Sequence, residues 1–222
     1  MANATLTHQV IDTGGSRSFE AGHPLVTGAA REGEIALILG RDAGARLATL
    51  PERERKRAIL VELGTECLGA HTGEARGQEG SNVLGFARFR IGRGEASDLV
   101  ELVRQPGSRI DAIAAARALF EGAGLVVAVC ADRPGRILDR LLRPYFNEVL
   151  KRLDEGLASA DDMDKTLRLG LGYPEGPLAL LERTGLAEHC GVTQALYEAL
   201  GQSAFAPARR AQVARMRAAT KD

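Results

Sequence analysis

The sequence has no excess of either charge, because 29 Lys and Arg residues are balanced by 29 Asp and Glu residues. A chain without net charge gives no reason to expect nucleic acid or an anionic membrane as its main partner. It also lacks any run of about 20 uninterrupted apolar residues, which argues against a membrane-spanning helix. The first residues, MANATLTHQVIDTGG, lack the basic region and apolar core of a signal peptide. We therefore expect a soluble, cytoplasmic protein.

Cysteine is scarce and widely spaced, with only Cys67, Cys130 and Cys190 in the chain. An odd number without a CxxC spacing argues against a disulfide framework and against a zinc site. We expect buried thiols in a reducing compartment and no metal ion.

Apolar material, in contrast, is sufficient for a sizeable core, since 45% of the 222 residues are hydrophobic. Residues 1–33 are rich in Gly, Ser and Thr without a clear period, and we interpret them as an arm or lead-in. Beyond them, apolar runs typical of strands alternate with helix-favouring segments, which predicts a small, shortened Rossmann-like α/β domain over 34–131. The strand-like runs are 33–40, 58–63, 84–91, 98–103 and 125–130, and the helix-favouring segments are 51–57 and 108–124.

The pattern changes after Pro134-Gly135, where strand-like runs stop and apolar residues recur at helical spacing. Ser159 and Pro177 suit the start of helices, and glycines suit their ends. The fold class is therefore α/β followed by all-α, with a helical domain over 132–222. Its expected helices cover 136–156, 160–170, 177–184, 186–200 and the residues after Pro207.

Three stretches of this second half carry a resemblance to a known family. They read DRPGRILDRLLRPYFNEVLKRLDEG (132–156), DKTLRLGLGYPEGPLALLERTGL (164–186) and LYEALGQSAFAP (196–207). Their order and spacing resemble the helical domain of NAD-dependent 3-hydroxyacyl-CoA dehydrogenases, and the resemblance extends upstream to about residue 98. It implies a helical bundle of the 6-phosphogluconate dehydrogenase C-terminal-like type, which in the family makes the dimer interface and closes over the acyl-CoA.

The family's reaction is a reversible hydride transfer between NAD and the 3-hydroxyl carbon of an acyl-CoA, and it needs a histidine base oriented by a glutamate. By resemblance, Glu101 matches the glutamate; its other interpretation is a surface or edge-strand carboxylate. The histidine should lie about twelve residues upstream, but residues 87–90 read Ala-Arg-Phe-Arg. Arginine stays protonated and cannot replace a general base. The chain has four histidines, His8, His23, His71 and His189. Only His71, expected in an exposed loop, is a distant candidate for the base.

A second site position falls on the first long helix. The family's polar residue there, usually asparagine, matches Asp139, which cannot donate a hydrogen bond when it is ionised. The other interpretation of Asp139 is a surface ion pair with Arg143, four residues further along the helix.

The nucleotide-binding loop is the largest departure from the family. A GxGxxG loop should follow the first strand, but Gly40 and Gly44 do not form that pattern, and TGGSRSF (13–19) is expected to lack a preceding strand. The span from Gly40 to Leu84 is too short for two βαβαβ halves. We therefore assign no cofactor-binding residue and expect NAD to bind weakly or not at all.

Three functions follow as hypotheses. The first is a catalytically impaired family member, like the second half of long tandem members, which forms a homodimer or pairs with a complete member. The second is an active NAD-dependent 3-hydroxyacyl-CoA dehydrogenase of fatty-acid or aromatic-acid β-oxidation that uses Glu101 and Asp139. The third is an acyl-CoA binding or sensing module, in which arginines contact the CoA phosphates. The arginines considered are Arg88, Arg90, Arg93 and Arg140.

Overall fold

The computed structural model describes residues 6–73 and 81–220, and the chain forms two compact units. Unit 1 comprises the chain up to Phe89 together with Ala96–Arg136. Unit 2 comprises Arg90–Glu95 and the chain from Ile137 onward. Each unit has its own hydrophobic core.

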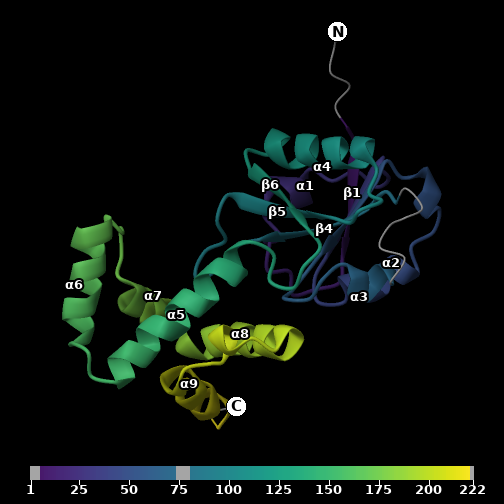
Figure 1. The fold of residues 1–222 in the computed structure, drawn as a ribbon. Coiled ribbons are helices and arrows are strands. Elements are labelled where there is room, and N and C mark those ends of the chain that lie inside the picture. The colour runs from purple at the N-terminus through teal and green to yellow at the C-terminus, as the bar shows by residue number, and fades with distance from the viewer. Residues whose placement is uncertain (1–5, 74–80, 221–222) are drawn as a thin grey trace. The chain divides into compact units, whose positions relative to one another are not determined.

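Unit 1 is built on one six-stranded sheet whose strands lie side by side in chain order (Figure 1). The first four strands run parallel, the fifth is antiparallel to the fourth, and the sixth is parallel to the fifth. The strands are β1 His8–Asp12, β2 Ile35–Leu39, β3 Ala58–Glu62, β4 Val83–Arg88, β5 Leu99–Arg104 and β6 Val126–Ala131. All five strand-like runs of the sequence are thus strands, and the α/β class is confirmed.

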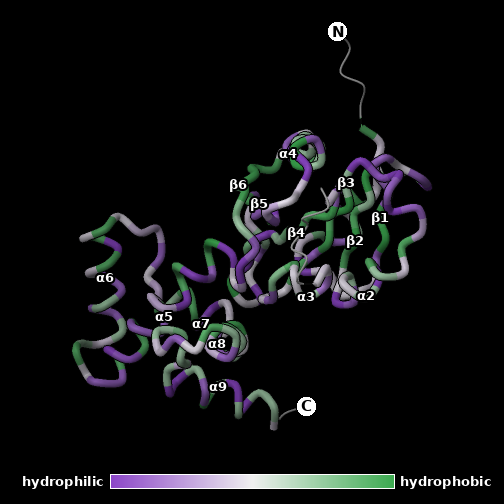
Figure 2. Tube along the Cα trace, turned by 45° about the vertical axis from the view of Figure 1, so that its right-hand side comes forward, coloured by the Kyte–Doolittle hydropathy of each residue, from purple (hydrophilic) through white to green (hydrophobic). Residues whose placement is uncertain are grey.

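Helices cover both faces of this sheet. Side chains on successive strand residues point to opposite faces, so each strand contributes to two separate clusters. Ile35, Leu37 and Leu39 of β2 pack in the cluster that contains α4 (Ile110–Gly122), whereas Ala36 and Ile38 pack in the cluster of the other face. The strands of unit 1 are accordingly largely green in Figure 2. The shorter helices of unit 1 are α1 Pro24–Thr27, α2 Ala43–Ala48, the 3-10 turn η1 Arg53–Arg55 and α3 Gly69–Thr72.

The N-terminal segment differs from the arm that we expected over residues 1–33. Residues 1–5 lie outside the described part of the chain, but His8–Asp12 is the edge strand β1, which pairs in parallel with β2. Val10 packs against one core cluster and Ile11 against the other. The sequence signal is weak because β1 is only half-buried and its residues, HQVID, mix polar and apolar types. The helix expected over 51–57 shortens to the turn η1.

Unit 2 contains the five expected helices, around a core that includes Phe146, Leu150 and Leu181. Ser159 caps α6, since its side chain accepts a hydrogen bond from the amide of Asp162, and Pro177 opens α7. The all-α class of this half is therefore confirmed. The helices are α5 Leu138–Asp154, α6 Ala160–Leu171, α7 Pro177–Thr184, α8 Leu186–Leu200 and α9 Arg209–Ala219, with the 3-10 turn η2 Ser203–Phe205 between the last two.

Within residues 6–73 and 81–220, no helix combines the length and the apolar character needed to cross a bilayer. The three cysteines are free; Cys190 is buried as expected, whereas Cys67 and Cys130 are only partly buried. The expectation of three buried thiols is therefore wrong for two of them.

The backbone at Gly40, directly after β2, gives a stability prediction. Gly40 has φ +99, and an added Cβ would lie 2.4 Å from the carbonyl oxygen of Gly14. Gly40→Ala should therefore lower the free energy of unfolding by about 2–4 kcal/mol, from left-handed strain and overlap together. Urea denaturation measures this change.

The matched control is Gly122→Ala at the end of α4, where an added Cβ meets nothing within 4 Å. Alanine is the better helix former, so this variant should be neutral or more stable by up to about 1 kcal/mol. Equal effects of the two substitutions would contradict the constraint at Gly40.

Candidate functional site

Glu101 lies on β5, between β4 and β6, and only 1% of its surface is exposed. It is therefore neither a surface nor an edge-strand carboxylate, and that interpretation is wrong. In the antiparallel β4–β5 pair, the residue directly opposite Glu101 is Ala87. Opposite residues of such a pair have Cβ atoms about 4.5–5.5 Å apart. The β4 position opposite Glu101 thus carries a methyl group, which neither accepts nor donates a proton.

Arg88, the next residue on β4, has a structural role. Its guanidinium donates hydrogen bonds to the carbonyl oxygens of Ser18 and Ser97, at 2.9 and 2.8 Å. It also lies over the ring of Phe19, 5.3 Å from the ring centre. Arg88 therefore ties the loop after β1 and the segment before β5 to the end of β4.

The charge of Glu101 is balanced by Arg136, the last residue of unit 1. The Arg136 Nε lies 3.3 Å from Glu101 Oε2, and Arg136 is itself only 7% exposed. The Arg136 Nη2 donates a second hydrogen bond, 2.7 Å long, to the carbonyl oxygen of Gly64. Arg136 adopts φ +49, an uncommon backbone conformation for a residue other than glycine. A buried pair of this kind is sensitive to the loss of either partner.

Cys130 lies near this ion pair on β6. Burial, and then the negative charge of Glu101, raises the pKa of the Cys130 thiol to about 11. Since the thiolate is the reactive form, Cys130 is protonated at neutral pH and is not an activated nucleophile.

Asp139 and Arg143 form the expected i,i+4 ion pair in α5, with 2.8 Å between Asp139 Oδ1 and Arg143 Nε. The pair is not on the surface, however, because both residues are buried. Arg143 Nη1 lies 3.1 Å from Nδ1 of His189, in α8. Because a guanidinium only donates, His189 Nδ1 is the acceptor and the ring proton lies on Nε2.

The same tautomer fits the rest of this buried network. His189 Nε2 donates to Oδ1 of Asn147 at 3.0 Å, and the Asn147 amide donates to Thr193 Oγ1 at 2.8 Å. The Thr193 hydroxyl donates in turn to the carbonyl oxygen of Phe205. Burial, and then the charge of Arg143, lowers the pKa of His189 to about 3. His189 is therefore a neutral core residue that links α5, α8 and η2.

The other three histidines lie in unit 1, on elements or loops other than β4 and β5. Burial, and then the charge of Arg88 on β4, lowers the pKa of His23. The ring Nε2 of His8, on β1, is 2.7 Å from the carbonyl oxygen of Leu25, and His23 caps α1. His71 is a half-buried residue of α3, 3.4 Å from a carboxylate oxygen of Glu66, rather than an exposed loop residue.

The loop TGGSRSF does have a strand before it, because β1 ends at Asp12. Our expectation to the contrary is wrong. The loop does not enter a long helix, since the next helix, α1, has four residues and begins at Pro24. The sheet order also lacks the reversal of the doubly wound order 3-2-1-4-5-6, which creates the dinucleotide crevice.

The backbone N–H groups in the loops after β1 and β2 already have a hydrogen-bond acceptor. The carboxylate of Glu62, at the end of β3, accepts hydrogen bonds from the backbone N–H groups of Arg17, Ser18 and Gly40. A nucleotide phosphate would bring a second negative charge to the same groups. The residues at this position therefore do not fit the phosphates of NAD.

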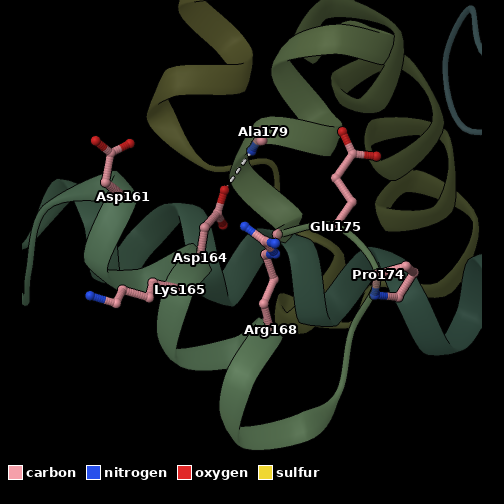
Figure 3. Close-up of a pocket in the computed structure, with 8 residues that line it drawn as sticks. Asp161, Asp164, Lys165, Arg168, Pro174, Glu175 and Ala179 are labelled. Carbon is pink, nitrogen blue, oxygen red and sulfur yellow. Dashed lines mark hydrogen bonds between the residues drawn. The ribbon is translucent and has the colours of Figure 1, made fainter.

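A hollow of about 380 Å³ lies on unit 2, between α6 and the start of α7. Figure 3 shows the side chains that line it. The side chains that line it include acidic and basic residues, among them Asp161, Lys165 and Arg168. Asp164 accepts hydrogen bonds from the first free amides of α7, at Leu178 and Ala179, so these amides are occupied. Across residues 6–73 and 81–220, no group of three or more His, Cys, Asp or Glu side chains could hold a metal ion.

Comparison with known proteins identifies the helical half. Residues 135–221 match the family model described as 3-hydroxyacyl-CoA dehydrogenase, C-terminal domain. The helical half of the chain is thus similar to the C-terminal domain of 3-hydroxyacyl-CoA dehydrogenases. It is 34% identical over 110 residues to the 3-hydroxybutyryl-CoA dehydrogenase of Bradyrhizobium diazoefficiens, a match that covers 50% of this chain and 38% of the relative. To the human mitochondrial hydroxyacyl-coenzyme A dehydrogenase it is 36% identical over 88 residues, 40% of this chain and 28% of the relative.

Solved structures agree on the fold. The crystal structure of (S)-3-hydroxybutyryl-CoA dehydrogenase from Ralstonia eutropha superposes with a TM-score of 0.67 at 26% identity. That superposition covers 85% of this chain and 66% of the other. These matches therefore span between 28% and 66% of the relatives' own lengths.

Several residues that organise the site were missed in the sequence. Arg136 and His189 bind partners 35 and 42–46 positions away, so no local pattern marks them. Glu62 carries a weak signal, since it is a carboxylate at the end of the buried run AILVE. An acidic residue there requires a partner, although the sequence does not say which.

The Glu101–Arg136 pair predicts strong coupling between two substitutions. Glu101→Gln should lower the free energy of unfolding by about 3 kcal/mol, because it leaves Arg136 buried without its counter-charge. Adding Arg136→Met removes that charge, and the double variant should recover most of the loss. A thermodynamic double-mutant cycle from urea unfolding measures the coupling, and additive effects would contradict it.

His189 predicts a pH dependence of stability. Its pKa is lowered to about 3 in the folded chain from an ordinary value of 6.5, so only the unfolded chain gains a proton as the pH falls below 6.5. Stability should therefore decrease by up to about 1.4 kcal/mol per pH unit between pH 6.5 and 3. His189→Gln should flatten this slope in urea unfolding at pH 7, 6 and 5.

The control is Thr193→Val, which removes a member of the same network that does not titrate. This variant should be less stable at every pH, with an unchanged slope. A wild-type slope in His189→Gln would rule out the histidine as the source of the pH dependence.

Proposed function

We propose that the chain is a non-catalytic member of the 3-hydroxyacyl-CoA dehydrogenase family that acts through its helical domain, by dimerising or pairing with a complete member and by binding acyl-CoA. One observation carries the proposal: the residue opposite Glu101 is Ala87, and the Glu101 carboxylate forms a buried ion pair with Arg136. Oxidation of a 3-hydroxyl group needs a base that takes the hydroxyl proton. A glutamate held by arginine, beside a methyl group, does not supply that base.

The part of the sheet where the family would bind NAD supports the same proposal. Glu62 occupies the amides at the carboxyl end of the sheet, and the strand order has no reversal. Both features oppose NAD binding in the usual crevice.

The second candidate function is an active dehydrogenase. It gains support from the relatives, which carry dehydrogenase names. It requires a base from outside β4, and it assigns Glu101 and Asp139 to the substrate. Asp139 is buried in an ion pair with Arg143, which opposes that assignment.

The alternative of a pure acyl-CoA sensor depends on arginines that meet the CoA phosphates. Arg88 is held by backbone carbonyl groups, and Arg93 forms an ion pair with Glu188 at 3.1 Å. These contacts favour a structural role for both, so the geometry gives the sensor less support.

A steady-state assay tests the proposal. The purified chain, at about 10 μM, should not oxidise NADH with acetoacetyl-CoA above a blank, because it lacks the base, whereas a complete family member should. NADH fluorescence should likewise remain unchanged on titration with the chain. Turnover above the blank that falls at least tenfold in Glu101→Gln would establish the active alternative instead.

The binding part needs its own measurement. Light scattering after size exclusion should give a dimer mass, and calorimetry with acetoacetyl-CoA should give binding without turnover. A monomer that gives no heat at high micromolar ligand would refute both modes of action.

A further inference from the structure

Three backbone N–H groups from two separate loops converge on one side chain in unit 1. Arg17 N and Ser18 N lie 2.9 and 2.8 Å from Oε1 of Glu62, and Gly40 N lies 2.7 Å from Oε2. Glu62 is only 7% exposed. Its two oxygens are thus shared between the loop after β1 and the loop after β2.

The position of these amides is that of an oxyanion site. They lie where β1, β2 and β3 end, which is the edge at which doubly wound α/β proteins hold the phosphates of a nucleotide. Phosphates are bound there by backbone N–H groups of glycine-containing loops. Here the loops TGGSRSF and Gly40-Arg41 present such groups, but a carboxylate of the chain itself accepts them.

The two loops are also fixed to each other. The Thr13 hydroxyl donates to the carbonyl oxygen of Leu39 at 2.8 Å, and Arg41 N donates to the carbonyl oxygen of Gly14 at 3.0 Å. The amides therefore hold their direction through contacts that do not involve Glu62.

We infer that this part of the fold is an internally filled oxyanion site, in which the Glu62 carboxylate takes the place of a phosphate. The side chain keeps phosphate-bearing ligands out by charge and by using all three donors. Removal of the carboxylate should uncover a site for small oxyanions. The inference rests on the proposed function in one respect only, namely that NAD does not occupy this position.

The experiment is chemical rescue of Glu62→Ala. Alanine removes a fragment equivalent to acetate, so the variant should lose at least about 5 °C in Tm and regain part of it in about 50 mM acetate or pyrophosphate. Sodium chloride at equal ionic strength should not restore the Tm. Amide signals of Ser18 and Gly40, followed by NMR, should shift with acetate in the variant and not in the wild type.

The control is Glu34→Ala, which removes an exposed carboxylate just before β2, at the opposite end of the strand. It should show neither the loss nor the rescue. A Glu62→Ala variant with wild-type Tm, or one that ignores both anions, overturns the inference. If Glu62→Ala is unfolded in buffer, circular dichroism should show that acetate or pyrophosphate refolds it. Failure to refold with either anion overturns the inference.

NADH separates this inference from the proposed function. If NADH shifts the Ser18 and Gly40 amides of the wild type, the filled site is refuted together with the absence of cofactor binding. Turnover without those shifts refutes the proposed function alone and leaves the acetate result standing.

Discussion

A charge removed from water must find its partner inside the protein, and this constraint organises unit 1. Glu101 is buried on β5, the fifth of the six strands, and Arg136, the last residue of unit 1 in the sequence, supplies the counter-charge. The pair fixes where the chain leaves the sheet, since Arg136 takes a left-handed backbone and α5 begins two residues later.

The same constraint applies to three groups of backbone N–H groups at loop and helix ends in the described part of the chain. Each group already donates its hydrogen bonds to an acidic side chain. Glu62 satisfies amides after β1 and β2, Asp132 accepts from Leu68 N and Gly69 N at the start of α3, and Asp164 does so at the start of α7. Backbone N–H groups in such places bind anions when they are left open. Here each set is closed by an acidic side chain of the chain itself, which stabilises the fold and excludes external anions.

Sequence predicts the elements of this fold better than it predicts the site. The strands β2 to β6 read as continuous apolar runs, and the helices α5 to α9 show apolar residues at helical spacing, so both kinds of element are visible locally. The edge strand β1 is missed because its half-buried residues give no clear alternation. The partners of Glu101, Glu62 and His189 lie at sequence separations of 22 to 46, and no local pattern encodes such contacts. The absence of histidine at residues 87–90 could be seen, whereas the pairing of Ala87 with Glu101 required the sheet register.

The two units are stabilised by separate sets of contacts. The clusters on the two faces of the sheet belong to unit 1, while Phe146, Leu150 and Leu181 belong to unit 2. The buried network of Asp139, Arg143 and His189 lies wholly within unit 2. The helical unit therefore does not need a dehydrogenase base or an open phosphate site for its own packing. The contacts that stabilise the helical unit therefore differ from those that neutralise Glu62 and Glu101 in the sheet, so a substitution that changes one set leaves the other in place.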